Sequence, residues 1–312
     1  MVSCELTDRG LQNGPGVLDR AHDDLPSVPV RHQTPAATGS LSRLLLTGIV
    51  VAFLGTFLVL PLIVVFVEAF RHGVTVYLAA ITDRDALAAI RLTLFVAVAA
   101  ITINTAFGLA AAWCLGKFRF PGRQLIIALI DLPISVSPVV VGLLLVLVYG
   151  RHGWLGSFLE GHGLRIIFAT PGIVLATAFV TLPLVVRELI PTMDAQGREQ
   201  EEAARLLGAN GWQVFLYVTL PSIRWALLYG VILCTARAVG EFGAVSVVSG
   251  HIRGLTTTVP LHVEILYNEY RFSSAFAVAS LLTIVGVVSL AGKTLLERMA
   301  RHRQMGIQHK AL

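Results

Sequence analysis

The sequence contains few charged side chains and few cysteines. Asp, Glu, Lys and Arg make up 14% of its 312 residues, compared with about 25% in an ordinary soluble domain. Hydrophobic residues make up 55%, and the mean hydropathy is +0.75. This composition excludes an ordinary soluble enzyme and indicates a protein of the lipid bilayer. Cys4, Cys114 and Cys234 show no CxxC spacing, so we expect small apolar fillers and neither disulfides nor metal ligands.

Motifs of enzymes and of nucleotide binding are also missing. Neither HExxH nor GxSxG occurs. Gly292-Lys293-Thr294 is similar to the end of a P-loop, but five residues separate Gly286 from Gly292, where the motif requires four. The net charge of +5 comes without a basic stripe interleaved with aromatics, so nucleic acid is not the expected partner. We expect no catalytic residue, metal or cofactor, and an intramembrane enzyme is a distant alternative.

Six long apolar runs dominate the rest of the chain. The first, Leu44 to Val67, is longer than the roughly 20 residues that cross about 30 Å of hydrocarbon as a helix. Lipid offers no partner to backbone polar groups, so repeated runs of this kind predict an all-α polytopic bundle. The expected spans are 44–67, 88–115, 125–149, 167–190, 225–248 and 272–292.

Positive charges near the span ends indicate the orientation. With the N-terminus inside, the cytoplasmic segments hold 14 Lys and Arg and the opposite side holds 7, which favours cytoplasmic termini in a bacterial inner membrane. The 14 are Arg31, Arg43, Lys117, Arg119, Arg123, Arg187, Arg198, Arg205, Arg224, Lys293, Arg298, Arg301, Arg303 and Lys310. The 7 are Arg71, Arg84, Arg91, Arg151, Arg165, Arg253 and Arg271.

The chain ends outside these spans are polar. Residues 1–43 mix Asp, Arg, Gly, Pro and Ser without apolar periodicity, which predicts a mobile cytoplasmic tail. A signal peptide is not expected, because the first apolar run is too long for one and lacks a good cleavage site. We therefore divide the chain into this tail, a membrane domain over 44–296 and a cytoplasmic C-terminal tail over 297–312.

A polar island, Glu201 to Arg224, separates the fourth and fifth spans. Helix-forming residues place Ala203, Ala204 and Leu207 on one face, with Glu201, Glu202 and Arg205 around it. Gly208 is expected to end this short helix, because glycine readily adopts the left-handed conformation of a helix end. Leu220-Pro221 is expected to open the next span, where the missing N–H of proline is harmless.

The spacing of this island carries a family resemblance. The order is Glu202-Ala203-Ala204, three residues, Gly208, nine residues, Val218, one residue and Leu220-Pro221. This spacing resembles the EAA loop of ATP-binding-cassette importer permeases. The resemblance implies a cytoplasmic segment that docks an ATPase; a solvated linker helix is the structural alternative. The implied docking residues are Glu201, Glu202, Ala203, Ala204, Arg205, Gly208, Leu220 and Pro221.

Two further stretches extend the resemblance to residues 45–295, the type I importer permease domain. ARAVGEFGAVSVVSG (236–250) and LHVEILYNEY (261–270) resemble the sulfate/thiosulfate permease family, the second its W-type membrane subunit. The family implies a second homologous permease, an ABC ATPase dimer and an extracytoplasmic sulfate-binding protein as partners, beside membrane lipid. A molybdate or other oxyanion permease is the alternative, and a non-transporting membrane scaffold is the alternative of another class.

Ionisable and polar residues in the expected fifth span are candidates for the translocation pathway. Arg237 and Glu241 are one helical turn apart and share a face, so they can pair with each other. Charged groups in a membrane face a partner or a wet cavity, and Arg237 can equally well line the path of an anion. Ser246 and Ser249, placed higher on the same helix, are compatible with a pore lining.

Two other patterns in the spans concern packing. Asp131, Pro133 and Pro138 interrupt the third span early, which predicts a kinked packing helix more than a broken helix that exposes backbone dipoles to substrate. Gly108, Ala112 and Gly116 recur every fourth residue in the second span, which lets another helix approach closely. That helix can belong to this chain or to another subunit.

Overall fold

The computed structural model describes the backbone of residues 40–308, which is helical without any strand in this range. The chain divides into two units, residues 1–55 and 56–312. The described part of the first unit is α1 (Ser40–Leu54), which a π-helical turn, η1 (Gly55–Val59), follows. Most of the expected N-terminal tail, with Cys4 and Arg31, lies outside the described residues.

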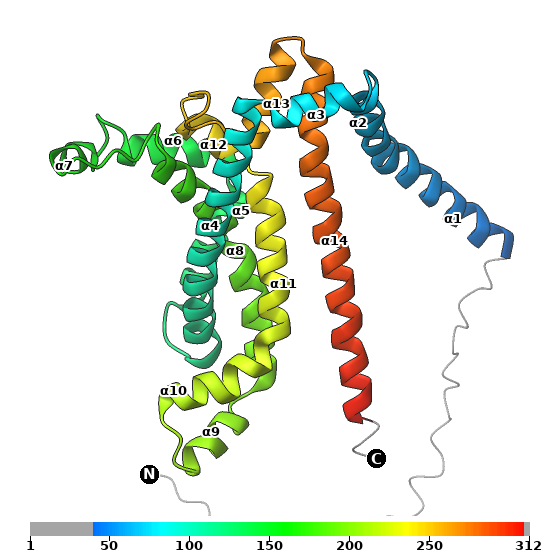
Figure 1. Cartoon of the computed structure of the whole chain (residues 1–312). Coiled ribbons are helices and arrows are strands. Elements are labelled where there is room, and N and C mark those ends of the chain that lie inside the picture. The colour runs from blue at the N-terminus through cyan, green and yellow to red at the C-terminus, as the bar shows by residue number, and fades with distance from the viewer. Residues whose placement is uncertain (1–39, 309–312) are drawn as a thin grey trace, which may run out of the picture. The chain divides into compact units, whose positions relative to one another are not determined.

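The second unit is a bundle of long helices with shorter helices at both ends (Figure 1). Its helices are α2 (Leu60–Phe70), α3 (Val74–Thr82), α4 (Arg84–Lys117), α5 (Arg123–Ser135), α6 (Pro138–Tyr149), α7 (Gly156–Gly161), α8 (Thr170–Gln196), α9 (Glu199–Leu206), α10 (Gly211–Val214), the π-helical η2 (Phe215–Thr219), α11 (Leu220–Val239), α12 (Gly243–Val248), α13 (Val259–Asn268) and α14 (Phe272–Gln308).

The predicted membrane bundle is confirmed. Among the described residues, five helical stretches are long and apolar enough to cross a membrane, and a sixth is obtained if the bent pair α5 and α6 counts as one span. The five are Ser42–Phe70, Arg84–Lys117, Thr170–Gln196, Gly211–Val239 and Phe272–Met299.

The fifth span differs from its prediction, 225–248. It begins at Gly211 and ends at Val239, and residues 240–242 separate it from α12. Pro221 lies in the first turn of α11, as expected, but the helix continues backward through η2. Proline cannot donate to the preceding turn, and π-helical turns commonly accommodate such an irregularity inside a helix. Apolar content alone did not reveal this extension into the polar island.

The third span is broken rather than kinked. Helices α5 and α6 meet at 109°. Val136 and Ser137 between them are extended, with ψ of 140° and 133°. Ser137 precedes Pro138, and a residue before proline avoids the helical region. Asp131 on α5 accepts a hydrogen bond of 2.7 Å from Arg187 Nε on α8, so this part of the break is tied to the bundle. The prediction of a simple kinked helix is therefore wrong.

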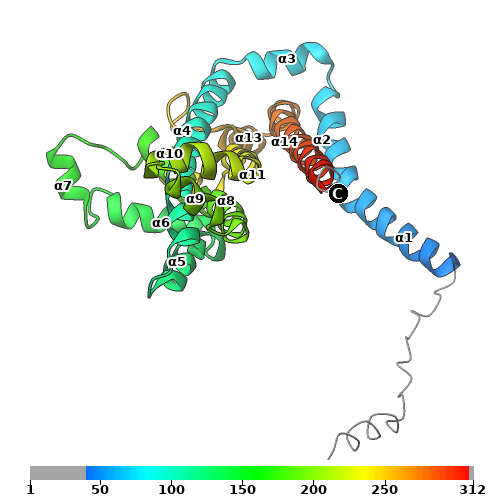
Figure 2. The same ribbon diagram turned by 90° about the horizontal axis from the view of Figure 1, so that it is seen from below.

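Helices α4 and α8 form the centre of the second unit. Gly108 and Gly116 of α4 face α8, where an added Cβ would lie 2.9 Å from Val185 Cγ1 and 2.8 Å from Met193 Cβ. Ala112, between them, is fully buried. The small-residue stripe therefore serves packing within this chain, the first of the two alternatives. Figure 2, seen along the bundle, shows α9 and α10 over the end of α8 and α11.

Candidate functional site

The polar island folds into a helical hairpin at one end of the bundle (Figure 1). Three acidic residues, Glu199, Glu201 and Glu202, lie in the first turn of α9, and Arg205 lies in its last turn. This distribution complements the helix dipole. The sequence therefore favours a helix here even though α9 has only eight residues.

Gly208 ends α9, as predicted. Its φ is +91°, in the left-handed region that favours glycine. The amides of Gly208 and Ala209 donate to the carbonyls of Arg205 and Ala204, at 2.9 and 3.0 Å. These two bonds form a Schellman motif, which satisfies carbonyls that the helix end leaves without partners. Gly208 therefore fixes the direction in which the chain leaves the helix.

The return of the hairpin starts at a capping box that the sequence analysis missed. Asn210 Oδ1 accepts from the Gln213 amide, and Gln213 Oε1 accepts from the Asn210 amide, both at 2.9 Å. An Asn followed by Gln three residues later is the sequence signal for this motif. The fifth span therefore begins with α10 at Gly211 rather than at Leu220-Pro221.

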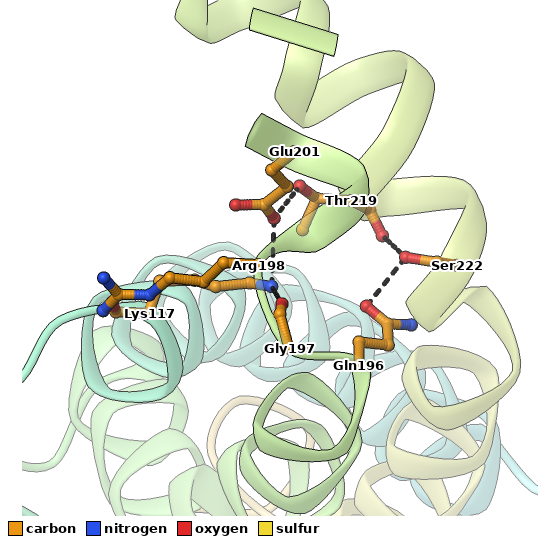
Figure 3. Close-up of polar contacts among 7 residues, drawn as sticks. All are labelled: Lys117, Gln196, Gly197, Arg198, Glu201, Thr219 and Ser222. Atoms are coloured by element: carbon orange, nitrogen blue, oxygen red, sulfur yellow. Dashed lines mark hydrogen bonds and ion pairs between the residues drawn. The ribbon is translucent and has the colours of Figure 1, made fainter. Parts of the chain in front are cut away.

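A buried ion pair holds the hairpin to the bundle (Figure 3). Lys117 Nζ, at the last residue of α4, lies 3.1 Å from Glu201 Oε1 and donates to the Gly197 carbonyl at 2.6 Å. Thr219 Oγ1 donates to the same Glu201 oxygen at 2.7 Å. Lys117 and Glu201 are only 6% and 7% exposed. Glu201, predicted as a docking residue on the polar surface of α9, is therefore an internal anchor.

A second set of bonds surrounds this ion pair. Ser222 Oγ lies 2.9 Å from Gln196 Oε1 and 2.7 Å from the Thr219 carbonyl, which links the ends of α8 and α11. The Arg198 guanidinium donates to the Lys117 carbonyl. In Figure 3 the Lys117 and Arg198 side chains run past each other in opposite directions. The ends of α4 and α8 and the starts of α9 and α11 thus meet at one polar cluster, which contains the buried ion pair.

The outer side of the hairpin carries exposed apolar side chains. Leu206 and Leu207 are 89% and 90% exposed, and Trp212 and Tyr217 are 73% and 77% exposed. Glu202, Ala203 and Arg205 of α9 are exposed as well. Leu206 and Leu207 lie beside charged side chains on α9, which indicates a contact with another protein rather than with lipid, whereas Trp212 and Tyr217 belong to the span Gly211–Val239.

Arg237 and Glu241 are paired, as one of the two interpretations predicted. Arg237 Nη1 lies 2.9 Å from Glu241 Oε2, with side chains 42% and 1% exposed. Glu241 Oε1 also accepts from the Ala244 amide at 3.0 Å, so this carboxylate holds the start of α12. Arg237, two residues before the end of α11, is thus the exposed partner of a buried carboxylate.

Ser246 and Ser249 do not share a helix with Arg237, so the prediction that they lie on the same helix is wrong, whereas their place in the pathway stays a prediction. Ser246 lies on α12, and Ser249 lies at its end. Ser246 Oγ donates to the Gly243 carbonyl at 2.9 Å. Ser249 is fully buried, and its Oγ accepts from the His251 amide at 3.2 Å. Both hydroxyls thus serve the local backbone.

The opposite end of the bundle holds a second group of ionisable side chains. His262 of α13 is 3% exposed, and burial lowers the pKa of its imidazole below the ordinary value. Arg253 pairs with Glu269, and this hydrogen bond raises the pKa of the guanidinium. His251 Nε2 lies 3.6 Å from Glu264 Oε2. No group of three His, Cys, Asp or Glu within the described residues has the arrangement of a metal site.

Comparison with known proteins gives a family and several relatives. The family model described as binding-protein-dependent transport system inner membrane component matches residues 104–302. The chain is 50% identical over 262 residues to the sulfate transport system permease protein CysW of Synechocystis sp., over 84% of this chain and 95% of that protein. CysW of Escherichia coli K12 is 50% identical over 253 residues, 81% of this chain and 87% of CysW.

More distant relatives agree with the architecture. The sulfate transport system permease protein CysT of Escherichia coli K12 is 35% identical over 280 residues, which cover 90% of this chain and 99% of CysT. A chain in the crystal structure of a bacterial alginate ABC transporter in complex with alginate pentasaccharide-bound periplasmic protein superposes with a TM-score of 0.67 at 17% identity. That match covers 84% of this chain and 94% of the other. At this identity the likeness shows the fold alone.

Proposed function

Because the chain belongs to the family of binding-protein-dependent transport system inner membrane components, we propose that it is a membrane-spanning permease subunit of an ATP-driven importer of sulfate or thiosulfate. The transport role rests on the hairpin, which exposes Leu206 and Leu207 and is held to the bundle by the buried Lys117–Glu201 pair. The substrate class comes from relatives at 50% identity, whose names specify sulfate transport.

The hairpin is the part of this chain that docks an ATPase. Its exposed apolar tip provides the contact, and the Lys117–Glu201 pair transmits force because it joins α9 to the end of α4. Closure of an ATPase dimer would pull on this tip and bias the bundle between inward-open and outward-open states, which is a coupling between two distant sites. A second homologous permease and an extracytoplasmic sulfate-binding protein complete the importer.

Sulfate uptake tests this function directly. In bacteria that lack their own sulfate permeases, expression of the chain with its partner subunits is expected to restore uptake of labelled sulfate. Thiosulfate should compete for this uptake more strongly than molybdate. Uptake of molybdate without uptake of sulfate would show that molybdate, not sulfate, is the substrate. Isolation of the chain without any bound ATPase would refute the transport role.

The orientation follows from the distribution of Lys and Arg. We place the hairpin and both termini in the cytoplasm, and the loop around Gly254 on the opposite side, by the positive-inside rule. A reporter active only outside the cytoplasm should be silent when fused near Gly208 and active when fused near Gly254. The reverse pattern would place the hairpin outside the cytoplasm, where it could not contact the ATPase.

Arg237 has a second role in this proposal, as an anion contact. Its side chain is 42% exposed although its partner Glu241 is buried, which supports contact with an anion. Arg237→Gln is expected to raise the sulfate concentration needed for half-maximal uptake about tenfold, since a charge-assisted hydrogen bond contributes roughly 1.5–3 kcal/mol. The complex should still assemble and hydrolyse ATP without substrate.

The double variant Arg237→Gln with Glu241→Gln separates this role from a structural one. If Arg237 only neutralises Glu241, the single variant leaves a buried carboxylate unpaired and assembly fails first, whereas the double variant restores it. Full uptake by the double variant with unchanged sulfate dependence would eliminate the anion contact.

A further inference from the structure

A partly open cavity of about 930 Å³ lies beside the anchor of the hairpin, where the ends of α4 and α8 meet the loop that follows α4. Its lining includes three arginines, Arg119, Arg123 and Arg198, and one carboxylate, Asp194. The formal charge of these four side chains is therefore +2. The transport mechanism proposed above makes no use of this cavity.

The arginines are held in different ways. Arg123 donates to the Leu115 carbonyl at 2.7 Å through Nε and to Asp194 at 3.0 Å, so its charge is neutralised. Arg198 donates to a backbone carbonyl, that of Lys117, and has no ion pair within the described residues. Arg119 is exposed, and the described part of the chain offers its guanidinium no hydrogen bond or ion pair. Two cationic groups thus face the cavity without a carboxylate.

The cavity lies at the depth where the spans end. Lys117 and Gln196 are the last residues of the apolar helices Arg84–Lys117 and Thr170–Gln196, and we infer that the arginines at and beyond these ends lie at the level of the lipid head groups. Leu115, Phe118 and Met193 supply an apolar part of the lining. A cationic rim next to an apolar wall matches an amphiphile with an anionic head, and basic pockets between membrane helices bind anionic lipid head groups.

We propose that this cavity binds a tetrahedral oxyanion, the phosphate of an anionic phospholipid, through Arg119 and Arg198. Ligand cavities of roughly 300–1,000 Å³ hold molecules of drug size, so a free sulfate or phosphate would leave most of this space unfilled. A glycerol backbone and the first part of an acyl chain, entering with the phosphate, would fill this space and contact the apolar wall.

Occupancy has a consequence for the hairpin, and this step rests on the proposed function. Arg198 contacts both the cavity and the Lys117 carbonyl, and Lys117 Nζ in turn holds Gly197 and Glu201. A phosphate on Arg198 would therefore stabilise the arginine in the position that supports the anchor. Coupling between ATP hydrolysis and transport then depends on anionic lipid.

The purified full-length chain in nanodiscs tests lipid binding without reference to transport. Native mass spectrometry and thermal unfolding would be compared in phosphatidylcholine alone and with added phosphatidylglycerol. We expect the chain to retain phosphatidylglycerol and to unfold at a higher temperature with it. Arg119→Gln should weaken this binding about fivefold, the effect of one charge near a lipid surface. Arg298→Gln on α14, also exposed but outside the cavity, is the matched control and should retain wild-type binding.

A second arm identifies the source of the oxyanion. In phosphatidylcholine nanodiscs, inorganic phosphate or sulfate should leave the unfolding temperature unchanged. If either ion raises the unfolding temperature of the wild type but not that of Arg119→Gln, the ligand is a free anion and the proposal of a lipid is overturned. Equal phosphatidylglycerol binding by wild type and Arg119→Gln would overturn the site itself. Loss of the ATPase from Arg119→Gln complexes, without loss of lipid, would show that a protein surface covers the cavity. Lipid binding without any effect on coupling would refute only the consequence for transport.

Discussion

Lys117→Met is expected to abolish sulfate uptake and to lower the free energy of unfolding by about 3–5 kcal/mol, the usual cost of removing one partner of a buried ion pair. Glu201 would keep only its bond from Thr219, and its carboxylate would remain buried without a cation. The Gly197 carbonyl would lose its donor as well. Chemical unfolding of the purified chain and uptake in intact cells measure the two effects.

The matched control is Lys293→Met. Lys293 is the other described lysine; it lies 4.0 Å from Glu297 in a partly exposed pair on α14 and 5.3 Å from the ring centroid of Tyr229 on α11, a cation–π contact that is weak at exposed sites. Exposed pairs contribute little to stability, so stability and uptake should stay close to wild type. The double variant Lys117→Met with Glu201→Leu should recover most of the lost stability, because an apolar pair of similar volume often replaces a buried ion pair without loss. Wild-type uptake by Lys117→Met would show that the anchor does not transmit force.

Gly208→Val is expected to reduce substrate-stimulated ATP hydrolysis at least tenfold while the chain still inserts into the membrane. The φ of +91° at this position costs an ordinary L-residue roughly 1–2 kcal/mol, and a β-branched side chain tolerates it least. Open space surrounds the position, since a Cβ there would meet no atom within 4 Å. The expected effect therefore comes from the backbone, which would turn Leu206 and Leu207 away from the ATPase.

Two companion variants isolate the backbone effect. Gly208→Asn should retain most of the activity, because asparagine tolerates the left-handed conformation. Gly211→Val places the same side chain three residues later, where φ is not positive and the surroundings are also open, and it should be close to wild type. If Gly208→Val and Gly211→Val lose activity equally, bulk at the tip rather than chain direction is responsible.

Signals that are local in sequence predicted their structures correctly. The short helix α9 and the glycine at its end depend on neighbours within one or two helical turns, and both are found. The small-residue stripe of α4 lets another helix pack closely, as predicted, although only the structure shows that this helix is α8. The capping box at Asn210 was equally local and would have corrected the start of the fifth span.

Contacts between distant segments could not be predicted. Lys117 and Glu201 are far apart in sequence, and nothing in either neighbourhood specifies the other, so Glu201 was assigned to the polar surface of its helix. Ser246 and Ser249 were misplaced for a related reason, because the predicted span 225–248 ran through residues 240–242, where the helix breaks. Hydropathy measures affinity for lipid and does not register a change of helix direction.

ATP hydrolysis by the reconstituted complex measures the central claim, that the hairpin couples an ATPase to sulfate import. The complex would contain this chain, its partner permease, the ATPase and the sulfate-binding protein, with either wild-type Leu206 and Leu207 or the pair Leu206→Asp and Leu207→Asp. The account predicts that sulfate stimulates hydrolysis by the wild-type complex, and that the double variant neither retains the ATPase nor responds to sulfate. Hydrolysis that ignores sulfate in the wild type, or a double variant with wild-type stimulation, would contradict it.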